Sequence, residues 1–303
     1  MLSTRYLFFT LKALVSALAL SWVFSRVDLG VVLRTSIELG AGPLVSVVLL
    51  SASSVFLASI RWRYIIANLD TAITVSTGKS FALSIIGSFF NLTLPGVIAG
   101  DTLRASLLYK ASGDLQAATS SFLIDRCLGL LTLLLMGSLA IPLAPLELHH
   151  AGATHLLAAL AILSTGLLAA LSHFKPLSTH NVIGCVYRHI SSLFSNAAKL
   201  LVVFALSILI HLVVTLAIYT LSGELHAGVT YFTFILILPL AQLVSALPLS
   251  IGGLGLREGA LVALLGYLEV APETAVSISL TWYLASVIAS SPGCVLLVLW
   301  RKH

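Results

Sequence analysis

Long apolar stretches recur along the whole chain, and they constrain its fold more than any other feature. Six of them reach the length of about 20 residues that a helix needs to cross a hydrocarbon layer of roughly 30 Å. Only 9% of the residues are charged and 59% are hydrophobic, whereas a soluble domain has about 25% charged residues. A water-soluble globule is therefore excluded. The six stretches are residues 6–24, 43–60, 116–139, 154–172, 200–222 and 276–300.

Two further apolar stretches, residues 81–108 and 229–268, are interrupted near their centres by proline and glycine. Irregular backbone at membrane depth is tolerated where it is buried in protein or lines a wet cavity. We therefore expect each stretch to form a re-entrant helical hairpin. The predicted fold is an all-α polytopic membrane protein, with six full transmembrane helices and two re-entrant hairpins in one integral membrane domain, residues 1–303.

The distribution of basic residues predicts the orientation. Arg5 and Lys12 precede a first stretch of spanning length without a convincing cleavage site, so we expect a retained helix and not a signal peptide. Most other basic residues fall on the same side as these two, and only Arg26 and Arg34 fall on the other. The positive-inside tendency then places both termini in the cytoplasm. The net charge of +5 is explained by this orientation and does not indicate nucleic-acid binding. The expected location is a cell membrane of the bacterial inner-membrane type.

The two interrupted stretches match each other without gaps. TLPGVIAGDTLRASLL from Thr93 aligns with ALPLSIGGLGLREGAL from Ala246, at a displacement of 153 residues. The same displacement relates a first half, about 1–150, to a second half, about 151–303. An odd number of crossings in each half predicts that the second half is inverted relative to the first. The hairpin tips would then approach the membrane centre from opposite sides.

The tips combine helix-breaking residues with arginines. Proline ends the entering half-helix, and glycine permits close approach of the backbone. Free amides near Gly100 and Gly253 would attract anions, and the guanidinium groups of Arg104 and Arg257 fit phosphate oxygens. Two quasi-symmetric phosphate sites would result. The hairpin backbone residues are Pro95, Gly96, Gly100, Pro248, Gly252, Gly253 and Gly255.

Intramembrane charges give these arginines a second interpretation. An unpaired charge at the centre of a spanning helix costs about 2.5–3.5 kcal/mol on insertion scales, so the arginines could instead neutralise carboxylates and fix the hairpins. A carboxylate in such a place could also carry a proton. The sequence leaves open whether Asp125 pairs with Arg104 or Arg257, and whether Arg126 pairs with Asp101 or Glu258. The substrate-binding candidates are Arg104, Arg257, Asp101, Asp125, Arg126, Glu258 and Asn91.

Two other polar groups have ordinary explanations. Residues 61–64, Arg-Trp-Arg-Tyr, follow the second span and are interpreted as an interfacial anchor. The acidic and histidine residues between 147 and 155 fit no strong metal-binding spacing. The three cysteines are far apart and suggest neither a disulfide nor a thiolate site. We expect no metal and no cofactor.

Three motifs resemble a known family. FFNLTLPGVIAGDTLR, DRCLGL and PLSIGGLGLREG occur in this order, and together they resemble the membrane domain shared by lysylphosphatidylglycerol synthase/flippase proteins, AglD-type and YbhN-type proteins. The resemblance implies a polytopic domain that moves an aminoacylated phospholipid between leaflets. It also implies importance for the proline, glycine and charged residues of the motifs. Ala99 departs from the Gly-Gly-Asp turn of the family pattern. No soluble synthase segment accompanies the spans, so we expect another protein to perform any lipid modification.

Three functions remain open on the sequence. The favoured one is a lipid translocase, or flippase, for an anionic, aminoacylated or polyprenyl-phosphate-linked lipid. The second is a membrane enzyme of glycosyltransferase type, although no nucleophile with an activating base is evident, so we do not expect an enzyme. The third is a non-transporting regulatory subunit. No Walker A motif indicates ATP hydrolysis. The expected partners are a lipid substrate and the bilayer, with a homo-oligomer or a separate lipid-modifying enzyme left open.

Overall fold

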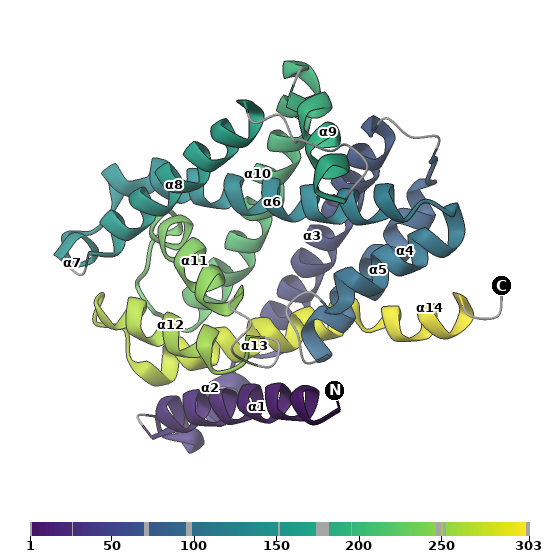
Figure 1. The fold of residues 1–303 in the computed structure, drawn as a ribbon. Helices are drawn as coiled ribbons and strands as arrows, with labels where there is room; N and C mark the ends of the chain where they lie inside the picture. The colour runs from purple at the N-terminus through teal and green to yellow at the C-terminus, as the bar shows by residue number, and fades with distance from the viewer. Residues whose placement is uncertain are drawn as a thin grey trace.

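The computed structural model describes residues 2–25, 27–69, 73–94, 99–150, 152–173, 182–194, 196–246, 250 and 253–300. Within these residues the chain forms α-helices and one short 3-10 helix, and no strand, which confirms the all-α prediction (Figure 1). The helices are α1 (Leu2–Phe24), α2 (Leu29–Glu38), α3 (Ala41–Asn68), α4 (Thr77–Thr93), α5 (Ala99–Ser112), α6 (Leu115–Ala140), α7 (Leu146–His150), α8 (Ala153–His173), α9 (Val182–Phe194), α10 (Ala197–Glu224), α11 (Tyr231–Ala246), α12 (Leu256–Gly266), α13 (Pro272–Ser290) and α14 (Pro292–Trp300).

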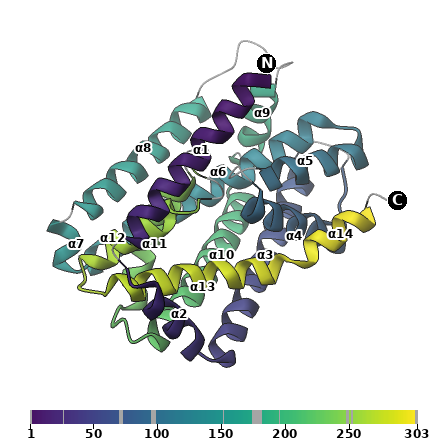
Figure 2. The same cartoon turned by 90° about the horizontal axis from the view of Figure 1, so that it is seen from below.

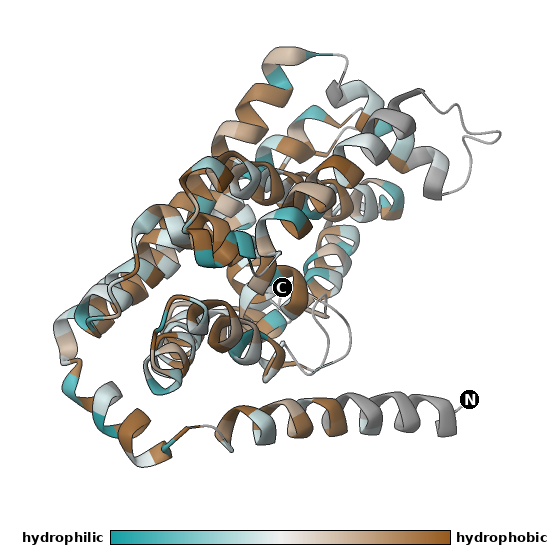
Figure 3. Cartoon of the chain, turned by 90° about the vertical axis from the view of Figure 1, so that its left-hand side faces the viewer, coloured by the Kyte–Doolittle hydropathy of each residue, from teal (hydrophilic) through white to brown (hydrophobic). Residues whose placement is uncertain are grey.

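Several helices are long and apolar enough to cross a membrane. Among the described residues, four helical segments meet this description, and a fifth does so if the bent pair formed by Leu14–Phe24 and Leu29–Thr35 is one span. Large apolar side chains such as Leu139 and Ile162 are more than two-thirds exposed, as expected of a surface that faces lipid, and hydrophobic residues are prominent along most helices (Figure 3). The chain is therefore a multi-pass membrane protein. The four segments are Ala41–Asn68, Leu115–Leu143, Ala197–Glu224 and Pro272–Trp300.

Each interrupted stretch forms two helices that pack against each other. The first gives α4 and α5, and the second gives α11 and α12. Two short helices, α2 and α9, were not predicted, because neither has the length of a span. The displacement of 153 residues carries Leu29, the first residue of α2, onto Val182, the first residue of α9, and carries Thr77 of α4 onto Thr230, beside the start of α11. The order of helices α1 to α6 thus recurs in α8 to α13.

Two long helices form the centre of the molecule. Helices α3 and α10 lie side by side, and α6 and α13 cross this pair (Figure 1). The α4–α5 pair packs beside α14, whereas α11 and α12 pack beside α6, α13 and α1 (Figure 2). Helices at corresponding positions of the two halves thus occupy corresponding places around the centre.

The contact between α4 and α5 depends on glycine. Gly100 lies so close to α4 that a Cβ atom added to it would collide with the carbonyl oxygen of Gly87 and would lie 2.6 Å from the backbone nitrogen of Asn91. Backbone atoms cannot rotate away as a side chain does. Glycine at position 100 therefore sets the distance between the two helices.

Replacing Gly100 by alanine should push α5 away from α4. We expect Gly100→Ala to lower the unfolding temperature of the purified protein in detergent by several degrees, because overpacking costs about 1–3 kcal/mol. Gly78→Ala is the matched control, since a Cβ atom added there meets nothing within 4 Å. Equal unfolding temperatures for the two variants would contradict this account of the α4–α5 contact.

Candidate functional site

A polar cavity of about 440 Å³ lies between helices from both halves of the chain. Helices α3 to α6 of the first half line most of it, and α10 and α11 of the second half complete its wall. It is the place where most of the charged residues predicted for the site come together. The polar residues of its lining are Ser54, Arg61, Ser84, Ser88, Asp101, Arg104, Asp125, Arg126, His211 and Gln242.

Five of these side chains form a chain of ion pairs with alternating charge. Asp125 accepts from Arg61 Nε at 2.8 Å and lies 3.3 Å from Arg104 Nη2. Arg104 Nη2 in turn lies 3.4 Å from Asp101 Oδ1, and the other oxygen of Asp101 is 2.5 Å from Arg126 Nη2. Of the pairings that the sequence left open, Asp125 with Arg104 and Arg126 with Asp101 are the ones that occur.

The interpretation of Arg61 as an interfacial anchor was wrong. Helix α3 continues to Asn68, two turns beyond the apolar stretch, so Arg61 lies inside the helix bundle and is only 6% exposed. Its Nη1 atom donates to Ser207 Oγ of α10 at 3.0 Å. Gly129 of α6 leaves space for the guanidinium group, since a Cβ atom there would lie 3.0 Å from Nη1. The glycine of the DRCLGL motif therefore admits Arg61 to Asp125.

Arg104 is held over an aromatic ring. Its guanidinium carbon lies 4.3 Å from the ring centroid of Trp62, which is fully buried. Trp62 is fixed by a hydrogen bond from its indole nitrogen to Ser121 Oγ at 3.2 Å. The Arg104 side chain has almost no freedom left, yet its buried Nε atom has no hydrogen-bond acceptor in the structure.

The cavity has an excess of positive charge among its described lining residues. Arginines 61, 104 and 126 face two carboxylates, those of Asp101 and Asp125. Among the described residues, Arg126 forms an ion pair with Asp101 alone, and its side chain is 52% exposed. Besides the Nε atom of Arg104, the buried hydroxyl of Ser84 on the same lining lacks a partner. Such a lining offers one net positive charge to an anion.

A smaller cavity of about 210 Å³ adjoins the first. Arg126, Val55 and Ser88 are among the residues that line both cavities. The smaller one extends to Asn91 of α4 and Trp282 of α13. The two cavities thus extend from the ion-pair chain to Trp282, whose ring lies beside Arg257.

Arg257 does not mirror Arg104. It pairs with its own neighbour, since Arg257 Nη2 lies 2.6 Å from Glu258 Oε1, and Ser279 Oγ donates to the same carboxylate. The guanidinium carbon lies 5.4 Å from the ring of Trp282 and 4.9 Å from that of Tyr283. Arg257 is neutralised, and it lines neither of the two cavities. The two arginines therefore have different surroundings, and only Arg104 lines the charged cavity.

The expected free amides at the helix starts are also occupied. Asn91 Oδ1 accepts hydrogen bonds from the backbone nitrogens of Gly100, at 2.9 Å, and Asp101, at 3.3 Å. At α12, Glu258 Oε2 accepts from the backbone nitrogen of Gly255 at 2.7 Å. Asn91 and Glu258 thus cap the two helices from within the protein, and these three amides are not available to a ligand.

The hairpin backbone residues are only partly covered by the structure. Pro95, Gly96, Pro248 and Gly252 lie outside the described residues. Gly253 and Gly255 precede α12 with φ angles of 80° and 82°, which glycine adopts at no steric cost. Within the described ranges no group of three or more metal-binding side chains lies together.

Three residues of the cavity lining were not predicted from the sequence as site residues: His211, Gln242 and Gly129. His211 lines the cavity, and its ring Nε2 is 2.9 Å from the Gly129 carbonyl oxygen. An ionisable residue inside the apolar stretch 200–222 was a usable signal, because such residues are costly in a membrane and tend to face a cavity. Gln242 in α11 could have been found in the same way.

The helices and the internal ion pairs define a polytopic membrane protein with a charged cavity. The chain belongs to the family described as "Lysylphosphatidylglycerol synthase TM region", which matches residues 9–293. This confirms the resemblance seen in the motifs and indicates a function related to membrane lipids. Among curated proteins, none shows significant sequence similarity to the chain.

Asp125 should be the most sensitive member of the ion-pair chain. Asp125→Asn leaves Arg61 and Arg104 without their shared counter-charge, and breaking a buried pair costs about 3–5 kcal/mol. We expect a strongly lowered unfolding temperature in detergent. Asp114→Asn is the matched control, because Asp114 caps α6 through the amide of Ala117 and asparagine caps equally well. An Asp125→Asn variant as stable as this control would refute the role of Asp125 as a shared counter-charge.

Proposed function

We propose that the protein is a lipid translocase that binds the phosphate of an anionic lipid headgroup in the charged cavity. The observation that carries this proposal is the excess of one positive charge among the described lining residues, together with the unpaired Nε atom of Arg104. An uncompensated charge within a membrane protein is expensive. A phosphate group would neutralise it and accept the available hydrogen bonds. The substrate class is an anionic, aminoacylated or polyprenyl-phosphate-linked lipid.

Arg126 is the side chain best placed to meet the headgroup. Arg61 and Arg104 are buried and fixed by several partners, whereas Arg126 is half exposed and lines both cavities. The lipid phosphate would bind at Arg126, beside the part of the lining that Arg104 and Ser84 form. We assign no bond-forming or bond-breaking step to the protein.

The transport mechanism that we propose uses the two halves as moving parts. Six full transmembrane helices and two re-entrant hairpins, α4–α5 and α11–α12, would form an inverted repeat with both termini in the cytoplasm of a bacterial cell. The recurring helix order and the cavity lined by both halves support this arrangement. Rocking of one half against the other would open the cavity to each side in turn. A separate enzyme would make or consume the lipid, and the translocase could work as a homo-oligomer.

The transport proposal is tested with purified protein in vesicles that contain headgroup-labelled phosphatidylglycerol. An impermeant reductant destroys the outer label at once and reaches the inner label only after transport. We expect Arg126→Gln to slow transport about tenfold, equivalent to about 1.4 kcal/mol, because it removes the excess charge while the remaining four charges stay paired.

Arg34→Gln is the control for this measurement, since Arg34 lies in α2 on the exposed surface and outside the cavity. It should transport lipid at the wild-type rate. If wild-type protein moves no more label than empty vesicles, with phosphatidylglycerol, its lysyl ester and polyprenyl phosphates alike, the translocase proposal fails. Equal rates for wild type and Arg126→Gln would remove the cavity from the mechanism.

The proposed topology is tested with single cysteines in a background without the native Cys127, Cys185 and Cys294. Cysteines at Glu147 and Glu269 should react with an impermeant maleimide added outside whole cells. Cysteines at Lys79 and Lys110 should react only after the membrane is opened, because they flank the first hairpin on the cytoplasmic side. All four wild-type side chains belong to described residues that are at least partly exposed. Outside labelling at Lys79 or Lys110 would disprove the inverted repeat.

A further inference from the structure

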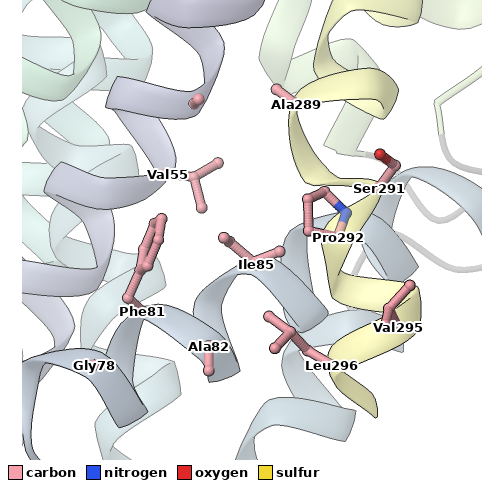
Figure 4. A pocket seen from close by; sticks show the side chains of 11 residues that line it. Val55, Gly78, Phe81, Ala82, Ile85, Ala289, Ser291, Pro292, Val295 and Leu296 are labelled. Carbon is pink, nitrogen blue, oxygen red and sulfur yellow. The ribbon is translucent and has the colours of Figure 1, made fainter. Parts of the chain in front are cut away.

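An apolar groove of about 860 Å³ lies on the molecule between α3, α4 and the junction of α13 with α14 (Figure 4). Its volume falls in the range of about 300–1,000 Å³ that is typical of ligand sites. Apart from one serine, the described residues of its lining have no polar side chain. The residues that form most of its walls are Ala52, Val55, Phe81, Ala82, Ile85 and Leu296.

The groove results from a helix break and two glycines. Helix α13 ends at Ser290 and α14 begins at Pro292, which has no amide hydrogen to continue the helix. Gly293 then brings α14 against α4, where a Cβ atom at position 293 would lie 2.6 Å from the Ile85 carbonyl oxygen. At the other end, Gly78 has no side chain, and an added Cβ atom would meet nothing within 4 Å. The space is therefore closed by α14 at one side and left unfilled beside Gly78.

Val55 lies between this groove and the charged cavity. It lines the groove, the charged cavity and the smaller cavity beside it. One side chain on α3 therefore forms part of the wall of an apolar site and of two polar ones. A ligand with a polar end and an apolar end could occupy both sides of Val55 at once.

The chemistry of the lining restricts the occupant. Among the described residues of the lining, the only hydroxyl is that of Ser291, and it already donates to the Ile288 carbonyl oxygen. An extended peptide would bring amide groups that find no partner there, and burying them unpaired is costly. A hydrocarbon chain brings no such groups. The groove is thus suited to a flexible apolar chain.

We propose that this groove binds the hydrocarbon chain of the same lipid whose anionic headgroup occupies the charged cavity. The proposal rests on the proposed function and adds to it that the protein recognises the lipid at both ends. Val55 separates the two subsites. Binding of the chain keeps the lipid attached to the protein while its headgroup crosses.

The groove can be filled without altering the charged cavity. Gly78→Leu places a side chain in the empty end, and Ala82→Trp fills the middle from the same helix. Gly42→Leu is the matched control, because Gly42 is also the second residue of its helix, an added Cβ atom there meets nothing within 4 Å, and it does not line the groove.

The probe is phosphatidylglycerol with a photoreactive diazirine near the end of one acyl chain, in vesicles of phosphatidylglycerol and phosphatidylethanolamine. After illumination, wild type and Gly42→Leu should carry the label on peptides of α4 and α14. In both filled variants this labelling should fall about tenfold, since each buried methylene contributes to affinity. Transport of the headgroup-labelled lipid should be slowed in the same two variants. Unfolding temperatures in detergent identify a variant that fails to fold, and the other variant then decides.

The outcomes separate the two proposals. If wild type transports lipid but the filled variants are labelled as strongly as Gly42→Leu, the groove proposal is overturned and the translocase proposal stands. If wild type transports no lipid, the translocase proposal fails, whatever the labelling. Labelling of wild type on neither α4 nor α14 also overturns the groove proposal. If a second copy of the chain occupied the groove, wild type would form a crosslink between two protein molecules, and the filled variants would not. This result would overturn the groove proposal.

Discussion

The packing of this protein depends on ion pairs between charged side chains, most of which are buried inside the helix bundle. Helices α3, α5 and α6 are connected by ion pairs of 2.5–3.4 Å, which join Arg61, Asp125, Arg104, Asp101 and Arg126 in this order. In surroundings of low dielectric constant a lone charge is expensive, so each member requires its neighbours. Since apolar side chains gain little by leaving lipid for the protein interior, polar contacts of this kind and close packing of small residues hold the helices together.

The chain of ion pairs also explains why small residues lie where they do. Gly129 leaves space for the Arg61 guanidinium, and Gly100 brings α5 close enough to α4 for Asn91 to cap it. Ser207 and Ser121 satisfy donors that would otherwise be buried without a partner. Position and polarity are thus coupled: a helix that moved away would leave both a gap and an unpaired group.

Much of the architecture could be predicted from the sequence. Apolar stretches of spanning length identified the long helices, and the breaks near residues 95 and 248 separated α4 from α5 and α11 from α12. For Asp125 and for Arg126, the sequence left two possible partners each and did not distinguish between them. The role of Arg61 was missed because a basic residue beside tryptophan after an apolar stretch usually marks the membrane surface, and only the extra turns of α3 place it inside. The unequal environments of Arg104 and Arg257 could not be foreseen, since aligned motifs do not reveal which carboxylate each side chain reaches.

The pairing of Arg257 with its own neighbour has a further consequence. Two halves with matching motifs would be expected to provide two equivalent anion sites. A transported anion would then move from one site to the other. Because Glu258 cancels the charge of Arg257, the excess positive charge among the described cavity-lining residues comes from the first half of the chain. In the proposed translocase, the lipid headgroup would then remain at one site while the surrounding helices move.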